Sequence, residues 1–113
     1  ILLGLMASGC NGQSFVFHGY LPVDATNRAL KIRALEQASQ QNAGQTQLFI
    51  EAPYRNQAML TAILTSAAAQ TWLCTATDLS LHSEEIHACS IQDWRKRHLP
   101  DLHKRPTMFI LQA

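Results

Sequence analysis

Apolar residues recur along this chain with the two periods that distinguish strands from helices. The segment 14–20 alternates, with Phe15 and Phe17 on one face, and this alternation predicts a strand. The segment 46–52 contains a continuous apolar run, which is typical of a strand covered on both faces. Pro53 lacks a backbone N–H and is expected to end this second strand. Both strands therefore run into sharp turns, and α/β sheets commonly bind ligands at such strand ends.

Two longer helices are predicted from apolar residues spaced three and four positions apart. The first begins at a capping residue, Asp24 or Thr26, and runs to about Gln41. We expect its apolar stripe to be Leu30, Ala34, Leu35 and Ala38. The side chains expected to face the solvent or a partner are Arg28, Lys31 and Arg33. The second helix spans 56–69 and should pack across the sheet. Its apolar stripe is Met59, Leu60, Ile63, Leu64 and Ala67.

The remaining segments continue the alternation of strands and helices. They are a buried helix end at 1–7, an antiparallel hairpin of strands 71–77 and 85–90, a short helix that Ser90 and Asp93 begin as a capping box, and a last strand at 107–111. This order predicts one α/β domain with a mixed sheet of about five strands and flanking helices.

Charge and cysteine content narrow the class of protein. The net charge of +1 predicts no broad cationic surface for nucleic acid, so any RNA contact would be local. The cysteines are widely spaced and contain no C-x-x-C pair, which favours a reducing cytoplasm over a disulfide framework. No apolar run is long enough to cross a bilayer, so we expect no membrane partner. The opening residues, ILLGLMASGC, are interpreted as part of a longer chain because a signal peptide would need a positive n-region.

The strongest candidate for chemistry is the turn that follows the second strand. Glu51 and Arg55 lie on either side of Pro53, where both side chains can point into a crevice. A carboxylate held near a cation stays ionised and can orient or deprotonate a hydroxyl, and Arg55 can grip a phosphate with two hydrogen bonds. The structural alternative is an ion pair that ties the strand exit to the next helix, and the five residues alone favour it slightly.

Three other groups each allow a structural and a functional interpretation. His18 and Tyr20 can exchange protons in a cleft or serve as partly buried sheet residues. A zinc site is considered and disfavoured, because no usual ligand spacing occurs among His82, Glu84, Glu85, His87 and Cys89. A basic loop could contact phosphates or be a solvated connection, and its charged residues are Arg95, Lys96, Arg97, Lys104 and Arg105.

Taken in order, these features resemble the C-terminal half of the tetrapyrrole (corrin/porphyrin) methylase superfamily. Within it they are most similar to the ribosomal-RNA ribose 2′-O-methyltransferase I branch. The matching residues are Ser8-Gly9, then Phe15-x-Phe17-x-Gly19-Tyr20-Leu21-Pro22, then Glu51-x-Pro53-x-Arg55, with Asp78-Leu79-Ser80 as a weaker block. The resemblance covers nearly all of the chain.

The resemblance implies an S-adenosylmethionine-dependent methyltransferase, of which this chain would be the C-terminal domain. Its implied partners are an N-terminal domain of the same protein, a second copy in a homodimer, and ribosomal RNA. The implied catalytic residues are Glu51 and Arg55. The implied cofactor contacts are Ala52, Pro53, Thr107 and Met108, and the implied substrate contacts are His18, Tyr20 and Asp78.

Two departures from the family pattern bear on the substrate. Thr77 and Asp78 replace a typical Arg-Glu, and the segment 104–108 replaces a Gly-Glu pair before the last strand. A tetrapyrrole or another small molecule is therefore an alternative methyl acceptor, since fold does not fix substrate. A further alternative is a dimerisation or regulatory module without catalysis. The isolated chain is expected to have little activity, because half of a cleft buries only part of a cofactor.

Overall fold

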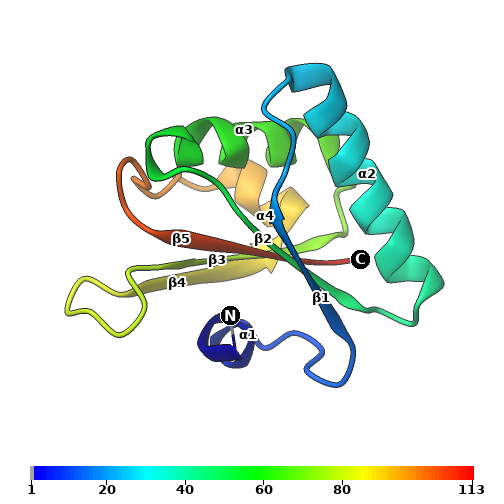
Figure 1. The fold of residues 1–113 in the computed structure, drawn as a ribbon, viewed down its shortest axis with the longest axis horizontal. Coiled ribbons are helices and arrows are strands. Elements are labelled where there is room, and N and C mark those ends of the chain that lie inside the picture. The colour runs from blue at the N-terminus through cyan, green and yellow to red at the C-terminus, as the bar shows by residue number, and fades with distance from the viewer. Residues whose placement is uncertain (1) are drawn as a thin grey trace.

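The computed structural model describes residues 2–113 and shows an α/β fold with a mixed sheet (Figure 1). In chain order the elements are α1 (Leu2–Ser8), β1 (Phe15–Tyr20), α2 (Ala25–Gln41), β2 (Thr46–Ile50), the 3₁₀ turn η1 (Pro53–Arg55), α3 (Asn56–Ser66), β3 (Trp72–Thr77), β4 (Glu85–Ser90), α4 (Ile91–Lys96) and β5 (Thr107–Gln112). The sequence of strands and helices predicted above is confirmed.

The five strands are arranged in the order β1-β2-β5-β3-β4. β1 and β2 are parallel, and α2 connects them, as parallel neighbours need a crossover. The other neighbours are antiparallel, and β3 with β4 forms the expected hairpin. β5 lies in the centre although it comes last, and it joins the β1–β2 pair to the β3–β4 pair.

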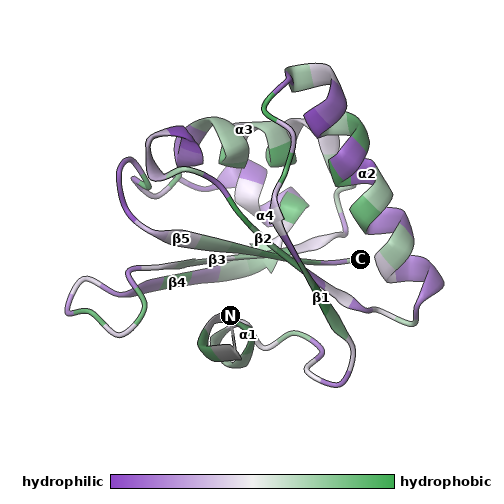
Figure 2. Ribbon diagram, in the orientation of Figure 1, coloured by the Kyte–Doolittle hydropathy of each residue, from purple (hydrophilic) through white to green (hydrophobic). Residues whose placement is uncertain are grey.

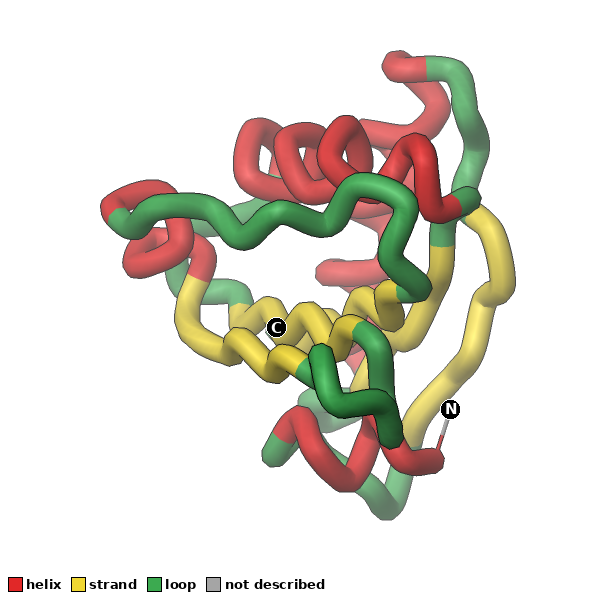
Figure 3. Tube along the Cα trace, turned by 90° about the vertical axis from the view of Figure 1, so that its left-hand side faces the viewer, coloured by secondary structure: helices red, strands yellow, loops and turns green. Residues whose placement is uncertain are grey.

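Helices cover the two faces of the sheet unequally. α2, α3 and α4 lie on one face, and α1 alone lies on the other (Figures 1 and 3). The larger core, under the three helices, includes Phe49 and Phe109, whose rings stack with centroids 5.6 Å apart. The smaller core, under α1, consists of Leu5, Leu48, Cys74, Ala76 and Ile110. The central strands are correspondingly apolar, while polar residues cover the outer side of α2 (Figure 2).

Two of the predicted helix starts are confirmed in atomic detail. Asp24 caps α2, with its Oδ2 accepting a hydrogen bond from the backbone N–H of Asn27 at 3.0 Å. Ser90 caps α4, with its Oγ accepting from the N–H of Asp93 at 3.2 Å. Such side-chain caps satisfy donors that the first turn of a helix leaves free.

The predicted apolar stripe of α2 is only partly confirmed, because Leu35 is buried whereas Leu30 is 56% exposed and Ala34 is exposed. The buried residues are Arg28, Ile32, Leu35, Glu36 and Ser39, so the prediction that Arg28 faces the solvent or a partner is wrong. The polar members of this face are buried because each finds partners. Arg28 donates to the carbonyls of Pro22 and Val23, and Glu36 accepts from the N–H of Ala68 at 2.8 Å. Bonded polar side chains can therefore occupy a core face that the apolar pattern assigns to other residues.

α3 buries the predicted stripe, with Met59, Leu60 and Ile63 fully inaccessible. It ends at Ser66, three residues earlier than predicted. β2 likewise ends at Ile50, before the predicted Ala52, because the chain turns into η1 at Pro53. Among residues 2–113, no helix has the length and apolarity needed to span a membrane.

Candidate functional site

The exit of β2 buries a carboxylate. The Glu51 side chain is 1% exposed, and its Oε1 accepts from the N–H of Ala52 at 2.7 Å. The same oxygen lies 3.2 Å from Nη2 of Arg55, so the predicted ion pair exists. The other oxygen, Oε2, is buried without a hydrogen-bond partner among the described residues, as is Nε of Arg55. Within residues 2–113, this strand exit thus holds a buried acceptor and a buried donor without the partners that buried polar groups normally have.

Arg55 is held by its neighbours. Its guanidinium lies 4.7 Å from the centre of the Tyr54 ring, and Nη1 donates to the Tyr54 hydroxyl. Tyr54 itself is 61% exposed. An aromatic face beneath a cation stabilises it electrostatically and limits its rotation. Arg55 is therefore fixed in position while 30% of its side chain stays accessible.

The segment before β5 is bonded directly to the β2 exit. The N–H of Lys104 donates to the carbonyl of Pro53 at 3.0 Å. Asn56 Nδ2 donates to the carbonyls of Leu102 at 3.3 Å and Arg105 at 2.6 Å. Ile50 pairs with Met108 across the two strands. We call residues 51–56 with residues 102–108 the β2–β5 corner.

The β2–β5 corner brings together all four residues predicted to contact a cofactor. Ala52 and Pro53 lie on one strand exit, and Thr107 and Met108 begin the neighbouring strand. Successive side chains of a strand point to opposite faces. Thr107 is buried and its Oγ1 donates to the carbonyl of Arg105 at 3.0 Å, whereas Met108 packs in the core under α1. A single ligand can therefore meet only one of these two side chains together with the backbone.

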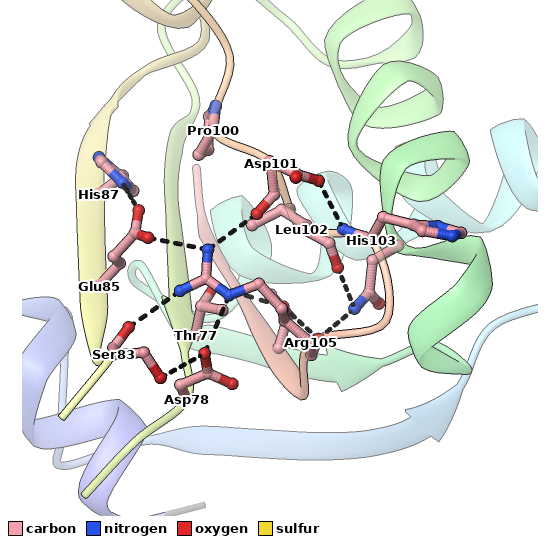
Figure 4. Close-up of polar contacts among 12 residues, drawn as sticks. Thr77, Asp78, Ser83, Glu85, His87, Pro100, Asp101, Leu102, His103 and Arg105 are labelled. Atoms are coloured by element: carbon pink, nitrogen blue, oxygen red, sulfur yellow. Dashed lines mark hydrogen bonds and ion pairs between the residues drawn. The ribbon is translucent and has the colours of Figure 1, made fainter. Parts of the chain in front are cut away.

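Asp78, at the exit of β3, is engaged by Arg105 (Figure 4). Its Oδ2 accepts from Nε of Arg105 and from Oγ of Ser83, each at 2.9 Å. The hydrogen bond from Arg105, followed by that from Ser83, lowers the pKa of Asp78. Arg105 Nη1 lies 2.8 Å from Glu85 Oε1 and donates to the carbonyl of Asp101, while Nη2 donates to the carbonyl of Ser83. We call Asp78, Ser83, Glu85, Asp101 and Arg105 the Arg105 cluster.

The three predicted substrate residues do not converge on one point. His18 and Tyr20 lie on the edge strand β1, where His18 Nε2 is 2.7 Å from Gln47 Oε1 and Tyr20 is 65% exposed. β1 and β3 are separated by β2 and β5, so three strand spacings of about 4.8 Å place Asp78 about 14 Å from β1. A shared site would need a substrate large enough to span this distance.

The arginines of the predicted basic loop bind the protein itself. Arg95 donates to the carbonyls of Leu64 and Ala67 at the end of α3. The guanidinium of Arg97 lies 4.8 Å from the centre of the Trp94 ring, with Nη2 2.8 Å from Nδ1 of His87. Together with Arg105 these contacts leave little of the loop's charge for phosphates. Lys96 and Lys104 are exposed, so the loop is solvated at its lysines and bound to the protein through its arginines.

The His and Glu residues of β4 pair with each other. His87 Nε2 lies 3.0 Å from Glu85 Oε2, since residues two apart on a strand share a face. This hydrogen bond, and then the one from Arg105, lowers the pKa of Glu85. Within residues 2–113, no three His, Cys, Asp or Glu side chains are grouped to hold a metal ion.

Two hollows lie at the opposite end of the sheet from the β2–β5 corner. One, of about 320 Å³, is lined by Gly9, Gln70, Trp72, Gln112 and Ala113. The other, of about 440 Å³, is lined by Gln40, Ala68, Ala69, Gln70, Thr71 and Ala113. Neither lining contains an ionisable side chain. The candidate site is therefore the set of strand ends at the β2–β5 corner, where buried polar atoms lack partners.

This fold is shared with the methyltransferase CobJ, whose crystal structure matches 99% of the chain with a TM-score of 0.59 and 13% sequence identity. The chain spans 47% of the length of CobJ. Models of known protein families and curated protein sequences give no match to the chain. The likeness establishes the fold alone: the strands and helices described here are arranged as in about half of the CobJ chain.

Proposed function

We propose that this chain is the C-terminal half of an S-adenosylmethionine-dependent methyltransferase, with the β2–β5 corner as one wall of the cofactor site. The observation that carries the proposal is that β2 pairs with β5 in a fold shared with CobJ, so that Ala52 and Pro53, which follow β2, lie at the same end of the sheet as Thr107 and Met108. An N-terminal domain would supply the opposite wall. A homodimer in the cytoplasm is part of the same proposal.

The backbone of Ala52 and Pro53 is hydrogen-bonded within the protein, to Glu51 Oε1, to the N–H of Arg55 and to the N–H of Lys104. The contacts with a cofactor at the corner would therefore come mainly from side chains. Bound S-adenosylmethionine supplies an electrophilic methyl group on a positively charged sulfur. Ala52, Pro53, Thr107 and Met108 would hold it.

Glu51 would orient the acceptor hydroxyl and take its proton as the methyl group is transferred. Its side chain is held in place by Arg55 Nη2, 3.2 Å from Oε1, and by the N–H of Ala52. The accessible 30% of the Arg55 side chain would meet an anionic group of the acceptor, such as a phosphate. Most of the acceleration would come from holding the two reactants in line.

The first candidate acceptor is a ribose 2′-hydroxyl of ribosomal RNA. The exposed Tyr54 ring next to Arg55 supports this proposal, because aromatic rings and arginine are what single-stranded RNA stacks on. Mapping of ribose methyls in ribosomal RNA from cells with and without the gene tests it. We expect one methyl group to be lost without the gene.

A tetrapyrrole or another small molecule is the second candidate acceptor. It is favoured by the engagement of Arg95, Arg97 and Arg105 within the protein, which leaves few cations for an RNA backbone. Unchanged ribosomal RNA together with tight binding of S-adenosylmethionine would support it. Absence of S-adenosylmethionine binding by the full-length protein would contradict both candidates and favour a dimerisation or regulatory module.

The role of Glu51 is tested by Glu51→Gln in the full-length protein. Because the amide keeps the shape and cannot take a proton, we expect turnover to fall about 100-fold while S-adenosylmethionine binding is retained. Glu84→Gln, a matched change at an exposed turn residue, should leave both unchanged. Full turnover by Glu51→Gln with intact cofactor binding would exclude Glu51 as the base.

A further inference from the structure

The Arg105 cluster joins two segments of the chain, 78–85 and 101–105. Arg105 Nε bonds to Asp78 at the exit of β3, Nη2 bonds to the carbonyl of Ser83 in the β3–β4 turn, and Nη1 reaches both Asp101 and Glu85. All three nitrogens of its guanidinium are thus engaged (Figure 4). Arg105 is therefore occupied by the protein and is not available to grip a ligand.

Strained backbone is concentrated around the Arg105 cluster. Among residues 2–113, the non-glycine residues with positive φ are Ala43, Asp78, Ser80 and Lys104. Three of these four lie in or beside the Arg105 cluster, with φ of 53° at Asp78, 69° at Ser80 and 59° at Lys104. Left-handed backbone costs about 1–2 kcal/mol for a residue with a Cβ and persists only where the surrounding structure holds it.

The bonds around Arg105 are what hold this backbone. The N–H of Asp78 donates to the carbonyl of Pro106 at 2.9 Å, and the N–H of Lys104 donates to that of Pro53 at 3.0 Å. The segment 104–107 is thereby fixed to the β3 exit on one side and to the β2 exit on the other. Arg105 supplies the charged contacts on the β3 side. β5 begins with Thr107 and Met108, two residues after Arg105.

We propose that Arg105 is a positioning residue for the cofactor site: it holds the start of β5 against the β3 exit and thereby sets the position of Thr107 relative to Ala52. This inference rests on the proposed function. Displacing bound groups by about 1 Å is enough to cost large factors in binding or turnover, so loss of the Arg105 contacts should be visible in cofactor affinity.

The test measures the affinity for S-adenosylmethionine and the melting temperature of full-length variants. We expect Arg105→Gln to raise the dissociation constant about tenfold, because the segment 104–107 loses its charged contacts on the β3 side. Arg105→Lys, which keeps the charge and one carboxylate contact, should restore part of the affinity. Lys is also the decisive variant if Arg105→Gln fails to fold.

Arg95→Gln is the matched control, because Arg95 bonds two backbone carbonyls at the end of α3, away from the β2–β5 corner. It should lower the melting temperature while leaving the dissociation constant within about twofold of the wild-type value. If Arg105→Gln or Arg105→Lys lowers only the melting temperature, as the control does, the inference is overturned and the proposed function stands. A wild-type protein that binds no S-adenosylmethionine overturns the proposed function itself.

Discussion

Asp78 and Glu85 share one guanidinium, and this makes their charge part of the stability of the fold. Both carboxyl groups have a lowered pKa, Asp78 mainly through the hydrogen bond from Arg105 and Glu85 through those from His87 and Arg105. A lowered pKa in the folded state means that the carboxylate form has a lower free energy there than in the unfolded chain, relative to the protonated form. The contribution is present above the usual pKa values and is lost as the pH falls below them.

We therefore expect acid to remove the advantage of the wild-type protein over Arg105→Gln. Above the usual pKa values of 3.8 for Asp78 and 4.5 for Glu85, the wild-type free energy of unfolding should be the larger. As the pH falls below these values, both carboxyl groups become protonated and the difference should shrink. Urea unfolding at a series of pH values from about 7 to about 3 measures it. A difference that does not change with pH would show that the Arg105 contacts are not charge-dependent.

At the scale of elements, the end of α2 carries a residue unsuited to its backbone. Ala43 has φ of 57°, in the left-handed region that helix ends usually assign to glycine. The following Gly44, with φ of 81°, donates its N–H to the carbonyl of Ser39 at 2.8 Å. The helix thus ends through two successive left-handed residues, and only the second is a glycine.

Ala43→Gly is expected to stabilise the protein by about 0.5–1 kcal/mol, because it removes the steric cost of a Cβ at positive φ. The matched control is Ala38→Gly, the same chemical change inside α2, which should destabilise by about 1 kcal/mol. Thermal or urea unfolding of the two variants gives the comparison. Destabilisation by both would mean that the freedom gained by the unfolded chain outweighs the strain at Ala43.

The sequence predicts those elements whose signals are local. The caps at Asp24 and Ser90 and the β3–β4 hairpin depend on residues close together in the chain, and the structure confirms them. The inner face of α2 is only partly predicted, because Arg28 and Glu36 are buried by hydrogen-bond partners outside the helix. Val23 lies five residues from Arg28, and Ala68 lies 32 residues from Glu36. Binary patterning cannot detect such partners.

In the candidate site, too, the features that depend on neighbouring residues are predicted and those that depend on distant segments are not. The turn at Pro53 is visible in the sequence, and so are Glu51 and Arg55 as a pair. The central place of β5 is not, because strand order depends on contacts between distant segments. Arg105 is missed as an organising residue since its partner Asp78 lies 27 residues away. The pairing of β2 with β5 explains why the four predicted cofactor contacts meet.

At the scale of the whole molecule, stability is concentrated where β5 crosses the larger core. Phe109 is fully inaccessible and stacks on Phe49, whereas Phe15 on the edge strand is 37% exposed. Phe109→Ala should cost about 3–5 kcal/mol of unfolding free energy through lost burial and the cavity left behind. Phe15→Ala, the same change at the edge, should cost less than about 1.5 kcal/mol. Equal losses in urea unfolding would contradict this distribution.

The central position of β5 also determines how far the sheet can form while the chain is being synthesised. A ribosome releases β1 with β2, and then β3 with β4, before the strand that separates them in the finished sheet. Until residues 107–112 emerge, each nascent pair has an open inner edge on which other polypeptides can pair. A translational pause before residue 107 would therefore leave two strand pairs with unpaired, aggregation-prone edges. Chaperones that cover strand edges would be needed most during this pause.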